Sequence, residues 1–424
     1  MSADCLVNDN VEVSGPKFTA RKNTAQQEIM KIPFNSNLAA FLSIILLLMP
    51  QTALSQQAAD YKYAPPAKLN DGIKTGTLRA AKIDEAKIIA GTNEILKGTF
   101  PNMHSFLIFR HGKLVYENYF TGEDVERGVG PLGVVNHTRD TLHDMRSVTK
   151  SVVAAAVLIA HSQGKIKSLD DPIFGYFPEY SKYAEGDKKN ITIKHVLSMT
   201  SGLEWDEKIS YADSKNSEIQ MNNASDAIEF VLKQKLVDKP GTVFNYSGGS
   251  TQLLVALIKK ATGMDADIFT EKQLFAPLGI TNYKWVKTKS GDPSGASGLR
   301  LRSRDMAKIG MTMVQRGKWN GKRIIPEELV DLAFTEHISI GKEDDFEMGY
   351  GFQIWLPSFD IGGMRVSLKE FSGNGGQLVQ IDQANGLMIA ATAGNYNNRG
   401  QLKTGRDFVE EFVYPALLDR KAAR

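Results

Sequence analysis

The chain has 424 residues, 42% of them hydrophobic, and a formal net charge of +3 at pH 7. This length and composition favour one large globular domain or two interleaved ones. The small charge is spread along the sequence without a basic cluster, so we expect no nucleic-acid partner.

The N-terminal segment is predicted to be a targeting sequence. Residues 38–49 form an apolar run that is too short to span a bilayer comfortably. Ala53 and Ser55 place small residues ahead of a peptidase cut before Gln56. We therefore expect residues 1–29 to be an extension ahead of the true start, residues 30–55 to be a signal peptide and residues 56–75 to be a linker. The alternative is an uncleaved membrane anchor.

This segment also determines the expected compartment and redox chemistry. The only cysteine, Cys5, precedes the expected start at Met30, so the mature chain would have no disulfide and no cysteine nucleophile. We expect a periplasmic or secreted bacterial protein with no stable membrane span after cleavage. The oligomeric state is left open.

The periodicity predicts elements from both secondary-structure classes. In chain order they are a helix over 83–96, a hairpin of strands over 105–110 and 113–120, a buried helix from Ser147, a mostly helical stretch over 165–345, strands over 352–355, 364–368, 377–381 and 387–391, and a helix over 405–418. Within the helical stretch the clearest helices are 226–233, with Ser225 as its N-cap, 249–261 and 303–316.

This order predicts an α+β fold. An antiparallel sheet would be built from both chain ends and flanked by helices, with a mostly helical region inserted in the middle. We expect one domain over 76–424, with a sheet subdomain over about 76–145 and 346–424 and a helical subdomain over about 146–345.

Ser147 and Lys150 form a Ser-x-x-Lys pair at the start of the buried helix. Side chains at positions i and i+3 lie on one helix face. If that face is dry, burial lowers the lysine pKa, and the amine can then take the serine proton. Three other Ser-x-x-Lys matches lie in polar or charged segments, at residues 14–17, 162–165 and 339–342. The alternative for Ser147 is an ordinary helix N-cap.

Two further segments would complete an acyl-transfer site. Tyr246, in Asn245-Tyr246-Ser247-Gly248, precedes a helix, and its phenol would act as base or leaving-group acid beside a cation such as Lys150. The alternative for Tyr246 is a tyrosine that anchors a loop. Residues 371–377 read Phe-Ser-Gly-Asn-Gly-Gly-Gln, and glycines there would let a backbone N–H approach an oxyanion. Their alternative is a glycine-marked turn or bulge.

Together these motifs resemble the serine β-lactamase/penicillin-binding-protein superfamily, in particular its class C-like branch of esterases, D-aminopeptidases and 6-aminohexanoate-dimer hydrolases. The resemblance covers residues 100–415 and implies a β-lactamase/transpeptidase-like fold. It implies Ser147 as nucleophile, Lys150 as the group that holds or relays the proton, and Tyr246 as general base. It also implies an oxyanion hole from the Ser147 N–H and a strand N–H at Asn374 or Gly375.

The sequence departs from the family pattern at two motifs. Gly248 stands where the family commonly has asparagine, and Phe371-Ser372-Gly373 stands where penicillin-recognising members have Lys-Thr-Gly. The missing cation argues against good β-lactam binding and towards an esterase or amidase. We expect Ser247, Gly248, Trp205 and Gly373 to line the substrate cleft.

Metal and cofactor chemistry are not expected. The seven histidines are scattered and no His-Glu-x-x-His occurs, so no zinc site is predicted. His143 is assigned to packing or capping rather than to the cleft. The glycine pattern at 128–133 contains Pro131 and opens no helix, so it is not taken as a dinucleotide site.

We therefore expect a metal-independent serine hydrolase acting through an acyl-enzyme on a small ester or amide. The alternatives are a D-aminopeptidase, DD-peptidase or weak β-lactamase, and a catalytically silent binding protein on the same fold.

Overall fold

The computed structural model describes residues 60–343, 346–398 and 402–421. The predicted extension and signal peptide, residues 1–55, lie outside the described residues. Among the residues described, no helix combines the length and the apolar character needed to cross a bilayer.

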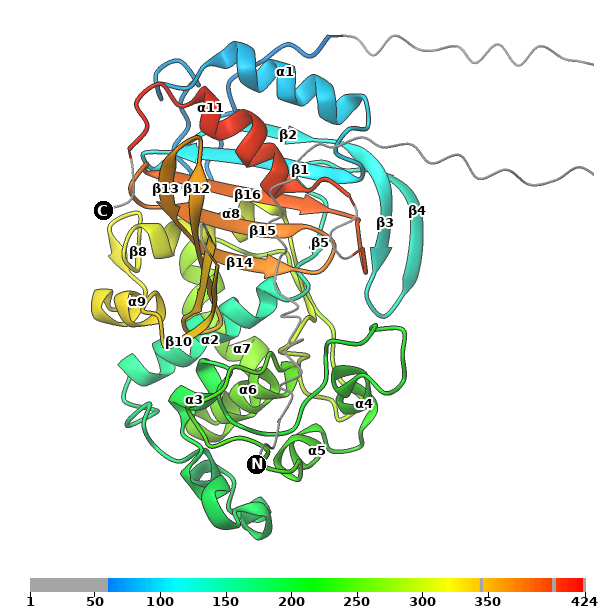
Figure 1. Ribbon diagram of the computed structural model, residues 1–424, viewed down its shortest axis with the longest axis vertical. Helices are drawn as coiled ribbons and strands as arrows, with labels where there is room; N and C mark the ends of the chain where they lie inside the picture. Colours follow the sequence, from blue (N-terminus) through cyan, green and yellow to red (C-terminus); the bar gives the residue numbers. More distant parts are fainter. Residues whose placement is uncertain (1–59, 344–345, 399–401, 422–424) are drawn as a thin grey trace, which may run out of the picture.

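A nine-stranded antiparallel sheet forms the centre of the fold (Figure 1). Its strand order is β10-β11-β12-β14-β15-β16-β1-β2, and β13 pairs with β12. The strands are β1 Met103–Arg110, β2 Lys113–Tyr119, β10 Ile338–Glu343, β11 Phe346–Tyr350, β12 Trp355–Ile361, β13 Met364–Ser367, β14 Lys369–Gly373, β15 Gln377–Asp382 and β16 Leu387–Ala393. Strands from the two chain ends meet where β1 pairs with β16. The predicted sheet from both chain ends is confirmed.

Strand β1 is buried on both faces, since side chains alternate across a strand. Phe106 and Ile108 join the core beneath α1 (Glu85–Leu96), α10 (Gly405–Phe408) and α11 (Tyr414–Ala416). Leu107 and Phe109 join the core on the opposite face, with α2 (Val148–Ser162) and α8 (Ser303–Val314). Each such fully buried side chain stabilises the fold by about 1.5–3 kcal/mol.

Helix α2 carries the predicted nucleophile into the centre of the molecule. Every residue from Val148 to Ala160 is buried, and α2 packs against α6 (Gly248–Thr262) and the sheet. The remaining helices of the inserted region are α3 Ile193–Leu197, α4 Ser217–Asn223, α5 Ala227–Leu232, α7 Ala266–Thr270 and α9 Glu327–Ala333. The short strands are β6 Lys284–Trp285, β7 Leu299–Leu301, β8 Lys318–Trp319 and β9 Lys322–Arg323.

A two-stranded arm that the sequence did not predict lies beside the sheet (Figure 1). It consists of β3 (Thr121–Glu126) and β4 (Gly130–Asn136), and the two-residue strand β5 (His143–Asp144) follows it and pairs with β7. The glycine pattern at 128–133 covers the end of the turn and the start of β4, with Gly128, Gly130 and Gly133 at positive φ. Glycines and a proline hide the period-two signal of these strands.

Two local predictions are wrong. Residues 352–354 form a turn, because Gln353 adopts φ 57° while its side-chain amide donates to the carbonyls of Val196 and Leu197. Helix α5 is capped by Asp226 rather than Ser225, since the Asp226 carboxylate accepts from the N–H groups of residues 228 and 229. The predicted C-terminal helix is present, with a π-helical turn at Val409–Val413 between α10 and α11.

Candidate active site

The turn before α2 holds Ser147 in a fixed position. Arg146 adopts a left-handed φ of 47°, a conformation that costs a non-glycine residue free energy and is held by its surroundings. Its guanidinium pairs with Asp144 at 3.0 Å and lies 4.4 Å from the ring centroid of Tyr396. Ser147 does occupy the N-cap position of α2, but within the described chain its hydroxyl makes no capping hydrogen bond. The side chain remains available to Lys150.

Lys150 and Tyr246 surround the Ser147 hydroxyl. Lys150 is only 1% exposed, and its ammonium donates to Ser147 Oγ at 3.1 Å and to the Ala296 carbonyl at 2.8 Å. Lys150 Nζ lies 4.8 Å from the centroid of the Tyr246 ring. The side chains of Ser147 and Lys150 both act to lower the pKa of the Tyr246 phenol, which places the three groups in one cluster. The structure therefore brings the three predicted catalytic residues together.

The protonation of this cluster differs from the sequence-based expectation. Burial pushes the Lys150 pKa down, but Tyr246, Glu207 and Glu218 outweigh burial, and the pKa is raised above its usual range. Burial raises the pKa of Tyr246, with Lys150 opposing and Glu207 assisting that shift. The expectation of a lowered lysine pKa is wrong because three acidic groups surround the ammonium. The raised pKa keeps Lys150 protonated at neutral pH, so the structure favours a cation at this position rather than the neutral amine that the sequence predicted.

Two buried carboxyl groups, Glu207 and Glu218, complete the charge balance around Lys150. Glu207 is 6% exposed and Glu218 is 1% exposed. Burial raises the pKa of Glu207 well above its usual value, with Glu218 adding to the shift. Burial opposes ionisation of Glu218 too, but Lys150 and Arg127 outweigh it and lower its pKa to about 2. The pair therefore holds one proton and one negative charge next to Lys150.

Gly248 is required by this carboxyl pair. Its N–H donates to Glu207 Oε2 at 2.6 Å. A Cβ atom at Gly248 would lie 2.9 Å from Ala296 Cβ, 3.0 Å from Glu207 Oε1 and 3.2 Å from Glu218 Oε2. The carboxyl pair thus fills the space that an asparagine side chain at this position would need. Sequence reasoning missed Glu207 and Glu218 because neither belongs to a motif near Ser147 or Tyr246.

The turn at residues 373–376 lies against Met145, two residues before Ser147. A Cβ atom at Gly373 would lie 2.5 Å from the Met145 carbonyl oxygen, so only glycine permits this approach. Asn374 turns its side chain towards Asn397, donating to Asn397 Oδ1 at 2.8 Å. Gly375 adopts φ 101° and accepts a hydrogen bond from the Asn395 N–H at 3.0 Å. A backbone N–H in this turn is the predicted partner of the Ser147 N–H at the oxyanion.

Residues 371–373, which stand where other family members have Lys-Thr-Gly, place no charged side chain on the α2 side of the sheet. Phe371 is 2% exposed and packs in the core that contains α2. Its neighbours Glu370 and Ser372 alternate to the other face, where Arg406 donates to both of them at 2.8 and 2.9 Å. Arg406 therefore does not replace the missing lysine on the α2 side of the sheet.

Aromatic side chains line one side of Tyr246. The Tyr246 ring stacks on Trp355 at 5.5 Å, and Phe244 and Tyr350 lie 5.8 and 5.0 Å from Trp355. Tyr350 is 1% exposed, so packing is its role, as the sequence favoured. These rings provide an apolar wall beside the catalytic phenol.

The other candidate cleft residues have structural partners. Trp205 is 7% exposed; its indole N–H donates to Glu207 at 2.9 Å, and its ring covers Gly249. Ser247 is the N-cap of α6, accepting from the Ser250 N–H at 3.1 Å. Both residues hold the Tyr246 segment and the carboxyl pair in place.

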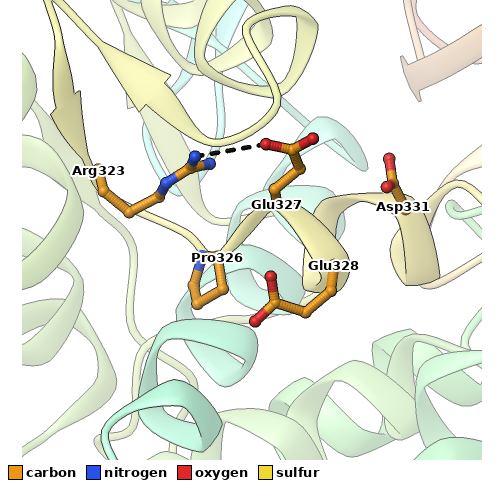
Figure 2. Close-up of a pocket in the computed structure, with 5 residues that line it drawn as sticks. All are labelled: Arg323, Pro326, Glu327, Glu328 and Asp331. Atoms are coloured by element: carbon orange, nitrogen blue, oxygen red, sulfur yellow. Dashed lines mark hydrogen bonds and ion pairs between the residues drawn. The ribbon is translucent and has the colours of Figure 1, made fainter.

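Two surface hollows accompany the site. One, of about 700 Å³, lies between the turn of the β3–β4 arm, Arg146 and residues of the 286–294 segment, and so adjoins the nucleophile turn. The other contains Arg323, Pro326, Glu327, Glu328 and Asp331, with Arg323 paired to Glu327 (Figure 2). The second hollow contains no serine, cysteine, histidine or lysine that could act as a nucleophile or base beside an acid, and Arg323, Glu327 and Asp331 are held in ion pairs.

The histidines are less scattered in space than in sequence. His104, His137 and His143 gather around Asp124, and all four side chains are buried. The argument from scattered spacing is therefore wrong for three of the seven histidines. His143 packs in this cluster, in agreement with the role assigned to it.

Comparison with known proteins identifies the family. Residues 99–407 match the family profile described as Beta-lactamase. The chain belongs to the Beta-lactamase family. Curated relatives include Protein flp of Staphylococcus aureus, 26% identical over 49% of this chain and 40% of flp, and Esterase EstB of Burkholderia gladioli, 28% identical over 43% of this chain and 47% of EstB. The matched segments span less than half the length of these relatives.

Solved structures share the fold. A Bacillus anthracis protein assigned as a 6-aminohexanoate-dimer hydrolase superposes with a TM-score of 0.61 at 21% identity, covering 76% of this chain and 81% of that one. EstCE1, a hydrolase with promiscuous acyltransferase activity, superposes with a TM-score of 0.59 at 17% identity, covering 79% and 98%. The β-lactamase-like fold predicted from the sequence is thus confirmed.

Proposed function

We propose that this protein is a serine hydrolase that cleaves small esters or amides through an acyl-enzyme on Ser147. The observation that carries the proposal is the buried Lys150 ammonium, 3.1 Å from Ser147 Oγ, beside the Tyr246 phenol. Because Lys150 donates to Ser147 Oγ, the serine proton points away from the lysine and towards Tyr246. This arrangement fits Tyr246 as the base and Lys150 as its electrostatic partner.

Acylation would proceed from the phenolate form of Tyr246. Ser147 Oγ attacks the carbonyl carbon, its proton moves to Tyr246 Oη, and the carbonyl electron pair moves to the oxygen. The Ser147 N–H and an N–H of the 373–376 turn would donate to that oxyanion. As the bond to the leaving group breaks, the Tyr246 proton moves to the leaving oxygen or nitrogen, which restores the phenolate beside Lys150.

Deacylation would reverse these roles. A water molecule gives its proton to Tyr246 as its oxygen attacks the acyl carbon, and Ser147 Oγ departs with that proton. The products are a carboxylic acid and the free enzyme.

We infer the substrate class from the missing charge at Phe371 and from the aromatic rings beside Tyr246. Phe371 replaces the lysine that would bind a β-lactam or peptide carboxylate, and aromatic rings border Tyr246. We therefore favour substrates without a carboxylate next to the scissile bond. The names of EstB and EstCE1 agree with ester chemistry, and the 6-aminohexanoate-dimer hydrolase likeness agrees with a linear amide.

The first test is covalent labelling. Intact-mass measurement after a fluorophosphonate should show one adduct on the wild type and none on Ser147→Ala. Ser151→Ala is a matched control, because Ser151 lies on the same helix but donates to the Gln353 carbonyl at 2.6 Å instead. An unlabelled, folded wild type would support the silent binding protein, and an adduct that survives in Ser147→Ala would remove Ser147 from the mechanism.

Substrate choice needs a second assay. We expect turnover of short-chain nitrophenyl esters or of 6-aminohexanoate dimer to exceed that of nitrocefin by at least about 100-fold in kcat/KM. Faster nitrocefin hydrolysis would favour the weak β-lactamase alternative over the esterase or amidase.

A further inference from the structure

We infer that four buried side chains, those of His104, Asp124, His137 and His143, bind one divalent transition-metal ion at a structural site. Their donor atoms favour Zn²⁺. The site lies between the β3–β4 arm and strand β5, which leads to Ser147. Each residue offers one ligand atom, and these atoms all lie within 4.8 Å of one another. The four residues are between 0 and 4% exposed. This inference does not depend on the proposed reaction.

The measured separations suit one tetrahedral ion. His104 Nδ1 lies 2.8 Å from His143 Nε2, and that nitrogen lies 3.7 Å from an Asp124 carboxylate oxygen. Zinc holds histidine nitrogens at about 2.0–2.1 Å in a tetrahedron, which places neighbouring donor atoms about 3.3 Å apart. The two distances bracket this value, so shifts of about half an ångström would complete the coordination.

Without a cation, two nitrogens of the histidine cluster have no hydrogen-bond partner among the described residues. If His143 Nδ1 donates to the Asp144 carbonyl, which lies 3.1 Å away, then His143 Nε2 carries a bare lone pair. If His104 Nδ1 donates to that lone pair, then His104 Nε2 is itself bare. Within the part of the chain that the structure describes, His104 Nε2 is buried with no hydrogen-bond partner.

The opposite tautomer of His104 is also unsatisfactory. If His104 carries its proton on Nε2, two lone pairs face one another across 2.8 Å. His137 Nε2 is a second buried nitrogen without a hydrogen-bond partner among the described residues. Buried polar atoms in native proteins are almost always paired, so these atoms point to an absent ligand. A cation bound by His104 Nδ1 and His143 Nε2 removes the conflict.

The donor set selects the class of ion. Three imidazoles and one carboxylate favour Zn²⁺ and its first-row neighbours over Ca²⁺ or Mg²⁺, which prefer oxygen ligands. The Tyr396 hydroxyl donates to the Asp124 carboxylate at 3.0 Å, an orienting contact typical of metal ligands.

The ligands come from four separate parts of the chain, so the ion would join them. His104 lies on β1, Asp124 on β3, His137 directly after β4 and His143 on β5, four residues before Ser147. Four protein ligands fill a tetrahedral site and leave no position for substrate, which is the pattern of a structural zinc site. The ion would thus fasten the arm to the central sheet and to the strand that leads into the nucleophile turn.

Metal content of the protein purified without an affinity tag tests the inference. After removal of bound metal with a chelator and addition of Zn²⁺, elemental analysis should give one equivalent per chain. Asp124→Asn and His137→Gln, which keep side-chain size, should each weaken Zn²⁺ binding at least about 10–100-fold. His111→Asn should keep the full equivalent, because His111 lies in the β1–β2 turn at a left-handed φ of 48°, which asparagine tolerates.

Two measurements on the wild type alone test the inference even if a variant does not fold. They are the visible absorption spectrum with bound Co²⁺ and the NMR signals of the histidine ring nitrogens. Co²⁺ should give the intense visible bands of a tetrahedral complex, and Zn²⁺ should shift the ring-nitrogen signals of three histidines. A folded wild type that takes up none of Zn²⁺, Co²⁺, Ni²⁺, Cu²⁺, Mn²⁺ or Fe²⁺ would overturn the inference. Equal binding by wild type, Asp124→Asn and His137→Gln would overturn it too.

Discussion

Two buried polar clusters flank the turn at Arg146 and Ser147, and they differ in how their charges are balanced. On one side of the nucleophile turn, Lys150 is matched by Tyr246, Glu207 and Glu218, and its ammonium donates to Ser147 and Ala296. On the other side, the histidine cluster contains nitrogens that have no donor or acceptor among the described residues. The first cluster balances its buried charges with its own side chains, whereas the second gathers donor atoms that a metal ion would join.

The largest expected effect comes from substitutions in the cluster around Lys150. Ser147→Ala should lower kcat/KM for a nitrophenyl ester at least about 10³-fold, because the nucleophile is lost. Lys150→Ala should cause a similar loss and should also reduce the free energy of unfolding by about 3–5 kcal/mol, since it leaves a buried carboxylate without its cation. Steady-state kinetics and denaturant titration measure both; near-normal turnover by Lys150→Ala would exclude Lys150 from the mechanism.

The next effect is the pH dependence of the same cluster. A raised Tyr246 pKa means that the phenolate is scarce at neutral pH, so kcat/KM should rise about tenfold per pH unit until that pKa is reached. Lys150, whose pKa is also raised, keeps its charge at neutral and mildly alkaline pH. A rate profile that is already flat above pH 7 would instead indicate a neutral lysine base.

Removing the proposed metal ion should lower the stability of the fold more than the rate of catalysis. At a Zn²⁺ concentration 100 times its Kd, binding stabilises the folded state by about 2.7 kcal/mol. We expect chelation to lower Tm by about 5 °C, while kcat falls less than tenfold because the ion touches no reacting atom. Calorimetry and kinetics on the same sample compare the two; loss of activity with an unchanged Tm would contradict a structural role for the ion.

Gly248→Asn sharpens the comparison by restoring the residue common in the family. The side chain would meet Glu207, Glu218 and Ala296, and we expect a loss of about 1–3 kcal/mol in the free energy of unfolding from crowding. Glu207→Ala in the same chain should return part of that loss, since it vacates the space. Additive effects in the double variant would show that Gly248 and Glu207 are uncoupled.

The smallest effect is expected at the surface hollow of Figure 2. Arg323 and Glu327 are both exposed, and exposed ion pairs contribute little. Arg323→Ala should change the free energy of unfolding by less than about 0.5 kcal/mol and leave kcat/KM unchanged. A larger effect on turnover would connect that hollow to the active site.

The candidate catalytic residues could be picked out from the sequence because local pattern locates them. Ser147 and Lys150 lie one helical turn apart before an apolar run, and Tyr246 precedes a helix. The sheet from both chain ends was predictable for the same reason, since β1, β2, β13, β15 and β16 alternate or run apolar between clear turns. Strands β10 and β11 and most of β12 were not predicted. The wrong strand at 352–355 followed from apolar residues that pack in a turn.

The protonation of Lys150 and the histidine cluster were not predictable, because both depend on side chains that are distant in sequence. Glu207 and Glu218 lie in a loop and a short helix without a recognisable motif, yet they reverse the expected shift of the Lys150 pKa. His104 and His143 are 39 residues apart, and an arm rich in glycine brings Asp124 to them. Only the tertiary fold gives such groups their common environment.

The pairing of β1 with β16 has a consequence for the timing of folding. The side chains of Ser105 and Thr392 meet at 2.7 Å although 287 residues separate them. At a synthesis rate of roughly 5–20 residues per second, the partner strand reaches β1 only tens of seconds later. Until then one edge of β1 has no partner strand and can pair with other chains. A ribosome-bound chain that ends before Leu387 should therefore need a chaperone to stay monomeric.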